Sequence, residues 1–254
     1  MSATLVLSVE TIPDINRIRR LFALDATLSD NEVAEYAFQR QRAQSGNDHL
    51  PFHLQQIQVV SCVLRTPERF EVFSFVGEEA ALLQAVCDTV KRCEPQIVAW
   101  DALDRIRPLF LCRGMLLNIE GGIHWNLTEK ARAPCFGSAE ALRTEIPLFD
   151  LERQLEAPNM PSRLPVLAQL MGYPAQSEPE AAHAWRLCAE EHVVDLQITC
   201  EQRALTTYLI FLRMLQAQGQ LDVQSRVAEE GFLRQQLAQM TIPGTVRFLQ
   251  DWRP

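Results

Sequence analysis

The sequence predicts an α/β fold: a mixed sheet, with three antiparallel strands and further parallel strands, flanked by helices and followed by a helical C-terminal part. Two observations support it. Short β-branched or aromatic runs alternate with helical patterns in the first part of the chain, and the last part carries helical patterns alone. With 254 residues and 47% hydrophobic content, the chain can bury a full core, so we expect one domain over residues 1–254.

The first element predicted is a short apolar strand over residues 4–8 that ends at Glu10. Residues 11–14 (TIPD) contain a proline and are expected to break this strand before a short helix. Residues 30–44 follow as a polar helix.

Two strands, residues 56–64 and 69–75, are separated by Thr66, Pro67 and Glu68, which predicts an antiparallel hairpin. Residues 77–92 have one apolar helical face, and residues 96–100 form a further strand. Three strands, a helix and a strand favour a ribonuclease H-like mixed sheet, although the pattern alone is compatible with other α/β arrangements.

The second half begins with an irregular insertion around residues 117–145, which has four glycine or proline residues and no sustained period. Helices are then expected over residues 162–171, 190–218, 227–240 and 242–252. In the longest of them, one apolar stripe is predicted to face the core.

Composition limits the function. A net charge of −8 and a pI near 5.2 give no overall attraction for nucleic acid, so any such site must be a local basic patch. Seven cysteines without a CxxC pair indicate reduced thiols and a cytoplasmic location. No signal-like head or apolar run of about 18 residues is present, so no membrane partner is expected.

Five strings resemble the predicted 3′-5′ exonucleases related to the proofreading domain of family B DNA polymerases, in the DEDD superfamily. The strings are residues 50–55 (LPFHLQ), 61–65 (SCVLR), 96–100 (QIVAW), 167–174 (LAQLMGYP) and 207–213 (TYLIFLR), and the resemblance extends over most of the chain, from Leu5 to Trp252. The resemblance implies a ribonuclease H-like fold and two-metal hydrolysis, in which four carboxylates hold two Mg²⁺ or Mn²⁺ ions about 4 Å apart.

Most of those ligands are replaced here. The family's opening Asp-x-Glu is Ser8-Val9-Glu10, so Glu10 alone is retained. Alignment on Trp100 and Pro108 places Ile106 at the second-motif Asp. In the third motif, Arg203 stands for the Asp and Thr199 for the Tyr that positions the attacking water.

Neighbouring acids do not restore the set. Asp101 and Asp104 lie near the second motif, and Glu201 lies two residues from position 203, which on a helix points it roughly 200° away. Asp150 matches a family position that is not a metal ligand. Because positions 10 and 203 converge on one metal in active relatives, we hypothesise that Arg203 fills that space and pairs with Glu10; the alternative is that Arg203 turns to solvent.

Other candidates are weaker. His183, Cys188 and His192 match no common zinc spacing, so no metal site is predicted there. The aromatic residues Tyr173, Trp185 and Trp252 could stack on bases but are expected in the core.

We therefore expect a catalytically degenerate exonuclease-like protein, a pseudoenzyme without a cofactor, that binds single-stranded DNA or RNA without cutting it. Arg105, Arg107 and Arg203 are the expected binding residues. A protein-interaction scaffold with a protein partner, and an active exonuclease with an altered metal site, are the alternatives.

Overall fold

The computed structural model describes residues 3–119, 125–126, 146–155, 163–175 and 181–252. Its sheet has six strands in the order β3-β2-β1-β4-β6-β5. The strands are β1 (Thr4–Pro13), β2 (Gln55–Arg65), β3 (Phe70–Val76), β4 (Gln96–Ala99), β5 (Trp125–Asn126) and β6 (Ile146–Asp150). Strands β1, β2 and β3 pair antiparallel, and β4 pairs parallel with both β1 and β6. The predicted ribonuclease H-like mixed sheet is confirmed.

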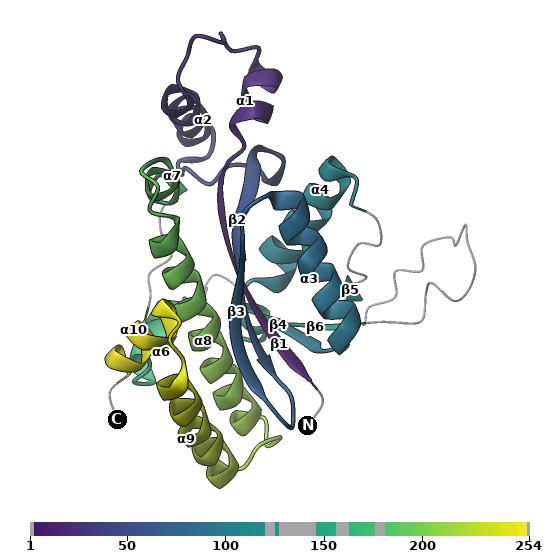
Figure 1. Cartoon of the computed structure of the whole chain (residues 1–254), viewed down its shortest axis with the longest axis vertical. Coiled ribbons are helices and arrows are strands. Elements are labelled where there is room, and N and C mark those ends of the chain that lie inside the picture. Colours follow the sequence, from purple (N-terminus) through teal and green to yellow (C-terminus); the bar gives the residue numbers. More distant parts are fainter. Residues whose placement is uncertain (1–2, 120–124, 127–145, 156–162, 176–180, 253–254) are drawn as a thin grey trace, which may run out of the picture.

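Helices cover both faces of this sheet (Figure 1). On one side lie α3 (Glu79–Cys93) and α4 (Arg107–Leu117), and on the other lie α6 (Leu164–Leu170), α8 (Val193–Ala217), α9 (Val223–Gln239) and α10 (Pro243–Asp251). Three helices lie near the end of the sheet where β1 ends and β2 begins: α1 (Ile15–Phe22), α2 (Asp30–Ser45) and α7 (Ala181–Ala189). Short turns η1 (Phe52–Leu54), η2 (Ala102–Ile106) and α5 (Leu151–Leu155) complete the described elements.

Strand β1 separates two hydrophobic cores. Leu5, Leu7 and Val9 belong to the core formed with α3 and α4, whereas Val6 belongs to the core formed with α8. Because successive side chains of a strand point to opposite faces, Ser8 and Glu10 lie on the same face as Val6, under α8. This alternation places Ser8 and Glu10, which belong to the first predicted motif, against helix α8.

One expectation about an element end is wrong. Strand β1 is not broken after Glu10 but continues to Pro13, because a register shift between Glu10 and Thr11 lets the strand stay paired with β2 as far as Gln55. The apolar stripe predicted for α8 is buried, and the burial extends further. Residues 200–212 are buried all round, because α8 is enclosed by the sheet and by α6, α9 and α10.

The irregular insertion predicted around residues 117–145 lies largely outside the described residues, apart from β5 and the end of α4. The prediction of a single domain stays a prediction. Within the described ranges, no helix is both long and apolar enough to cross a membrane.

A buried ion cluster joins β1 to α3 and α4. The Arg113 guanidinium, 1% exposed, donates to both oxygens of Glu79 at 2.8 and 2.5 Å and to Asp14 at 2.8 Å. Burial acts to lower the pKa of Arg113, but the hydrogen bonds and charge of Glu79 and Asp14 outweigh it and raise that pKa. The Glu79 carboxylate depends on this cation for charge compensation in the interior, whereas Asp14 also pairs with Arg17 at 3.0 Å.

Replacing Arg113 by Met should therefore destabilise the protein by about 3–5 kcal/mol, because it leaves the buried Glu79 carboxylate without its cation and removes one of the two cations beside Asp14. The measurement is urea denaturation at neutral pH. Arg69→Gln is the matched control: its partner Glu71 is solvent-exposed, so we expect a loss of at most about 1 kcal/mol. Equal unfolding midpoints for the two variants would show that the cluster does not stabilise the fold.

Candidate functional site

The retained acid of the first motif is buried. Glu10 is 2% exposed on β1, opposite Val59 of β2. Ser8, two residues earlier, is opposite Ser61. Both side chains face α8, where the predicted metal site would be built.

Helix α8 carries the partner of Glu10. The Arg203 guanidinium, 8% exposed, donates through Nη1 to Glu10 Oε1 at 2.5 Å and through Nη2 to the carbonyl oxygen of Val9 at 3.3 Å. The predicted pair is thus confirmed, and the alternative of a solvent-facing Arg203 is wrong. The guanidinium satisfies a carboxylate that would otherwise be buried without compensation.

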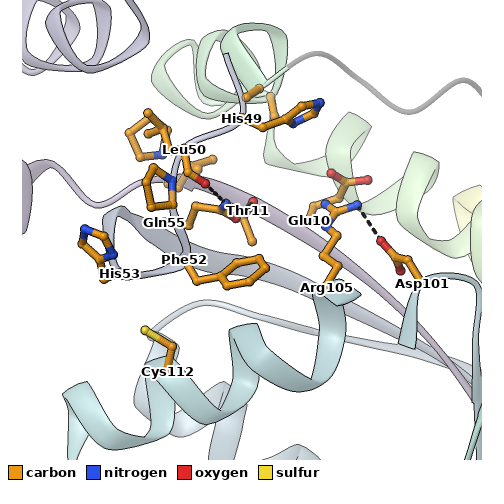
Figure 2. A pocket seen from close by; sticks show the side chains of 15 residues that line it. Glu10, Thr11, His49, Leu50, Phe52, His53, Gln55, Asp101, Arg105 and Cys112 are labelled. Atoms are coloured by element: carbon orange, nitrogen blue, oxygen red, sulfur yellow. Dashed lines mark hydrogen bonds and ion pairs between the residues drawn. The ribbon is translucent and has the colours of Figure 1, made fainter. Parts of the chain in front are cut away.

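A second guanidinium converges on the same strand end. Arg105, from η2, donates through Nη2 to the Val9 carbonyl at 3.5 Å and pairs through Nη1 with Asp101 at 3.4 Å. Figure 2 shows Arg105 beside Glu10 with its ion pair to Asp101. Two arginines and two carboxylates therefore surround the position where β1 passes under α8.

Two cavities open on either side of this cluster and share His49, Asp101 and Arg105 in their walls. Cavity A, about 670 Å³, is the pocket of Figure 2; cavity B is about 650 Å³. Cavity A is lined by residues 10–13, residues 49–53, Gln55, Asp101, Arg105, Cys112, Ala181 and Ala184. Cavity B is lined by residues 7–9, His49, residues 100–101, residues 105–106, Glu152, residues 163–166, Arg203 and Thr207.

Cavity B brings together three positions that the resemblance assigns to lost metal ligands. Ser8, Ile106 and Arg203 all line it, and Glu10 is joined to it through Arg203. Thr199, at the lost tyrosine position, is not among the lining residues, and its hydroxyl donates to the Asp195 carbonyl within α8.

The neighbouring acids have structural partners. The Glu201 carboxylate accepts hydrogen bonds from Ser74 at 2.8 Å, from Gln197 at 2.8 Å and from the backbone N–H of Gly244 at 3.1 Å. A Cβ at Gly244 would lie 2.7 Å from the Cβ of Glu201, so α10 packs directly on this side chain. As expected from the helical spacing, Glu201 points away from Arg203 and joins α8 to β3 and α10.

The acids of the second motif also have other contacts. Asp104, 62% exposed at its side chain, pairs with Arg153 at 2.6 Å. Asp150 accepts hydrogen bonds from the backbone N–H groups of Leu103 and Arg153 and ties η2 to the end of β6. Burial raises the pKa of Asp150 despite these hydrogen bonds.

The cysteines near Glu10 are poor nucleophiles. Burial, with the negative charge of Glu10 adding to it, raises the pKa of both Cys188 and Cys200 to about 11. Both thiols are therefore protonated at neutral pH, whereas a reactive cysteine needs its thiolate.

The remaining predicted residues lie elsewhere. Arg107 begins α4 and is not among the residues that line cavities A and B. His183 and His192 are exposed, and no group of three or more His, Cys, Asp or Glu side chains in the described ranges is placed to hold a metal ion. Tyr173 and Trp252 are buried in the α8 core, as expected, and the half-buried Trp185 donates to Asn31.

Three lining residues were not predicted as site residues: His49, Glu152 and Arg163. His49 is far in sequence from Glu152 and Arg163, and the three residues belong to no motif with a fixed spacing. What they share is a position after a strand end or beside the start of a helix. This shared position can be recognised only when the order of the strands in the sheet is known.

The residues present do not fit a pair of divalent ions. Mg²⁺ and Mn²⁺ prefer several oxygen ligands, commonly carboxylates. Around cavity B the four expected positions supply one carboxylate, one hydroxyl, one alkyl chain and one guanidinium, and the carboxylate is held by the guanidinium. The Arg203 guanidinium lies against Glu10, at a position where the resemblance implies a metal ligand.

The chain matches a family model described as a predicted 3′-5′ exonuclease related to the exonuclease domain of PolB, over residues 47–252. Strand β1, with Ser8 and Glu10, precedes the matched region. A search of curated proteins found no match. The match includes both later motif positions, Ile106 and Arg203.

The Glu10–Arg203 pair makes a testable contribution to stability. Arg203→Met alone should cost about 3–5 kcal/mol, because it leaves the Glu10 carboxylate buried without a cation. The double variant Glu10→Gln with Arg203→Met removes both charges and should recover most of that loss. Urea denaturation of the wild type, both single variants and the double variant measures the coupling; additive losses would contradict a buried pair.

Proposed function

Because the chain belongs to the family of predicted 3′-5′ exonucleases related to the exonuclease domain of PolB, and because Arg203 pairs with its one retained acid, we propose that it binds single-stranded nucleic acid in cavity B without hydrolysing it. The observation that carries this proposal is the exchange of acidic metal ligands for a guanidinium at the same site.

The lining of cavity B supports an anionic ligand. Three arginines, Arg105, Arg163 and Arg203, line the cavity with two carboxylates, Asp101 and Glu152. Because Glu10 is bound to Arg203, the site is formally neutral with His49 neutral, whereas the whole chain carries −8. Four carboxylates, with a formal charge of about −4, would repel a phosphodiester unless metal ions were bound. The lining of cavity B does not need metal ions for this purpose. A volume of about 650 Å³ is in the range that holds one or two nucleotide-sized groups.

Hydrolysis has no route that the described side chains support. In the two-metal reaction one ion activates water and the other stabilises the leaving oxygen. Here the Glu10 carboxylate is held by Arg203 and the nearby thiols are protonated. What the cavity retains is binding and orientation of the strand.

A protein-interaction scaffold is the second candidate function. It is favoured by Val166 and Leu170, which are 51% and 79% exposed on α6, one helical turn apart and beside cavity B. Their exposure gives a partner an apolar contact next to the former active site. Either function suits the reducing cytoplasm, since the described cysteines are all free thiols.

The test is incubation of end-labelled single-stranded DNA and RNA with Mg²⁺ or Mn²⁺, with length and mobility shift followed in the same samples. We expect shifted oligonucleotides of unchanged length. Arg163→Gln should weaken binding roughly tenfold, because a charge-assisted hydrogen bond to phosphate is worth about 1.5–3 kcal/mol. With three arginines in the lining, the slope of log affinity against log salt should be on the order of −2.

The control is Arg69→Gln, which removes an exposed arginine outside both cavities and should bind as the wild type does. Metal-dependent shortening of the oligonucleotide would overturn the proposal in favour of an active exonuclease with an altered metal site. Neither shift nor shortening would favour the scaffold.

A further inference from the structure

Two guanidinium groups meet at one backbone oxygen in the wall between the cavities. The Nη2 atoms of Arg203 and Arg105 lie 3.3 and 3.5 Å from the carbonyl oxygen of Val9. They reach it from different elements, α8 and η2, and both side chains line cavity B. Groups that approach a common atom so closely are within reach of a single phosphate group.

The two arginines differ in how firmly they are held. Arg203 is 8% exposed and bound to Glu10 at 2.5 Å. The Arg105–Asp101 contact is 3.4 Å, with both side chains about a quarter exposed. Arg105 is therefore the more accessible of the two guanidinium groups to a ligand in cavity B, while Arg203, paired with Glu10, stays in place.

The chemistry of this pair favours one kind of anion. Guanidinium groups bind phosphate oxygens in a planar, bidentate manner, and two of them side by side suit a ligand with more than one negative charge. A phosphate monoester carries roughly −1.5 to −2 at neutral pH, whereas each internal phosphodiester carries about −1. The exposed Arg163 adds a third cation to the same cavity.

We propose that Arg105 and Arg203 form a metal-independent binding site for a nucleotide phosphate monoester, either the terminal phosphate of an oligonucleotide or a free nucleoside monophosphate. The two guanidinium groups take the electrostatic role of the metal ions for binding only, and no bond is made or broken. The inference rests on the proposed function in placing nucleic acid in cavity B, but a mononucleotide tests it separately.

The experiment compares one single-stranded 12-mer with a 3′-hydroxyl, a 3′-phosphate or a 5′-phosphate, labelled at the opposite end, by fluorescence anisotropy in excess EDTA. We expect a terminal phosphate to tighten binding about tenfold or more. Arg105→Lys keeps the charge but loses the planar fork, so this preference should fall to within about twofold. Arg69→Gln should keep it.

Competition with AMP and with inorganic phosphate separates the sources of the ligand. Displacement of the phosphate-ended 12-mer by AMP at lower concentration than inorganic phosphate supports nucleotide recognition, and equal displacement by the two overturns it. Equal affinity for hydroxyl and phosphate ends, a preference that requires Mg²⁺, or an unchanged preference in Arg105→Lys would each overturn the inference. If oligonucleotides with hydroxyl and phosphate ends bind equally well, the proposed binding function still stands although the inference fails. If AMP binds and the oligonucleotides do not, the inference stands for a free nucleotide and the proposed oligonucleotide ligand is wrong.

Discussion

The buried carboxylate of Glu10 constrains the rest of the site. A carboxylate that is 2% exposed has to be compensated by a cation, and the candidates in this fold are divalent ions or a basic side chain. Arg203 provides that cation from inside the protein, at 2.5 Å and with a second hydrogen bond to the same strand. Once the guanidinium is in place, additional acids at positions 8 and 106 have no ion to bind and would only repel one another. Ser8 and Ile106 are therefore compatible with Arg203 in a way that two aspartates without metal ions would not be.

The position of Arg203 depends on contacts made by the other side of α8. Glu201, about 200° away around the helix, binds Ser74 of β3 and the backbone N–H of Gly244 at the start of α10. The hydroxyl oxygens of Ser74 and Ser61 also lie 2.8 Å apart, so a row of hydrogen-bonded polar side chains crosses β3 and β2 beneath α8. These contacts fix the rotation of α8 about its axis, and with it the point at which Arg203 reaches β1. The acid that could not serve as a metal ligand thus orients the arginine that replaced one.

Much of the fold follows from local patterns, and the departures have physical causes. The hairpin at Thr66, Pro67 and Glu68 was predictable because a turn sequence separates two β-branched runs. The extension of β1 to Pro13 was not, since it depends on a register shift created by pairing with β2. Ile106 and Arg203, which the resemblance assigns to two different motifs, line one cavity. The places of His49, Glu152 and Arg163 could not be predicted, since His49 meets the segments that carry Glu152 and Arg163 only in the folded chain.

The charge distribution determines what kind of binding this cavity supports. At −8 the protein repels a polyanion beyond roughly one Debye length, about 8–10 Å, so long-range electrostatic steering works against association. Attraction begins only at short range, where the three arginines in the lining of cavity B can contact the ligand. Such a site discriminates by the local charge and shape of the group that enters, more than by the total charge of the polymer. An end of a strand can enter a cavity of about 650 Å³. Under the proposed function, the Arg203 guanidinium that binds Glu10 therefore makes cavity B suited to holding a terminus without metal ions.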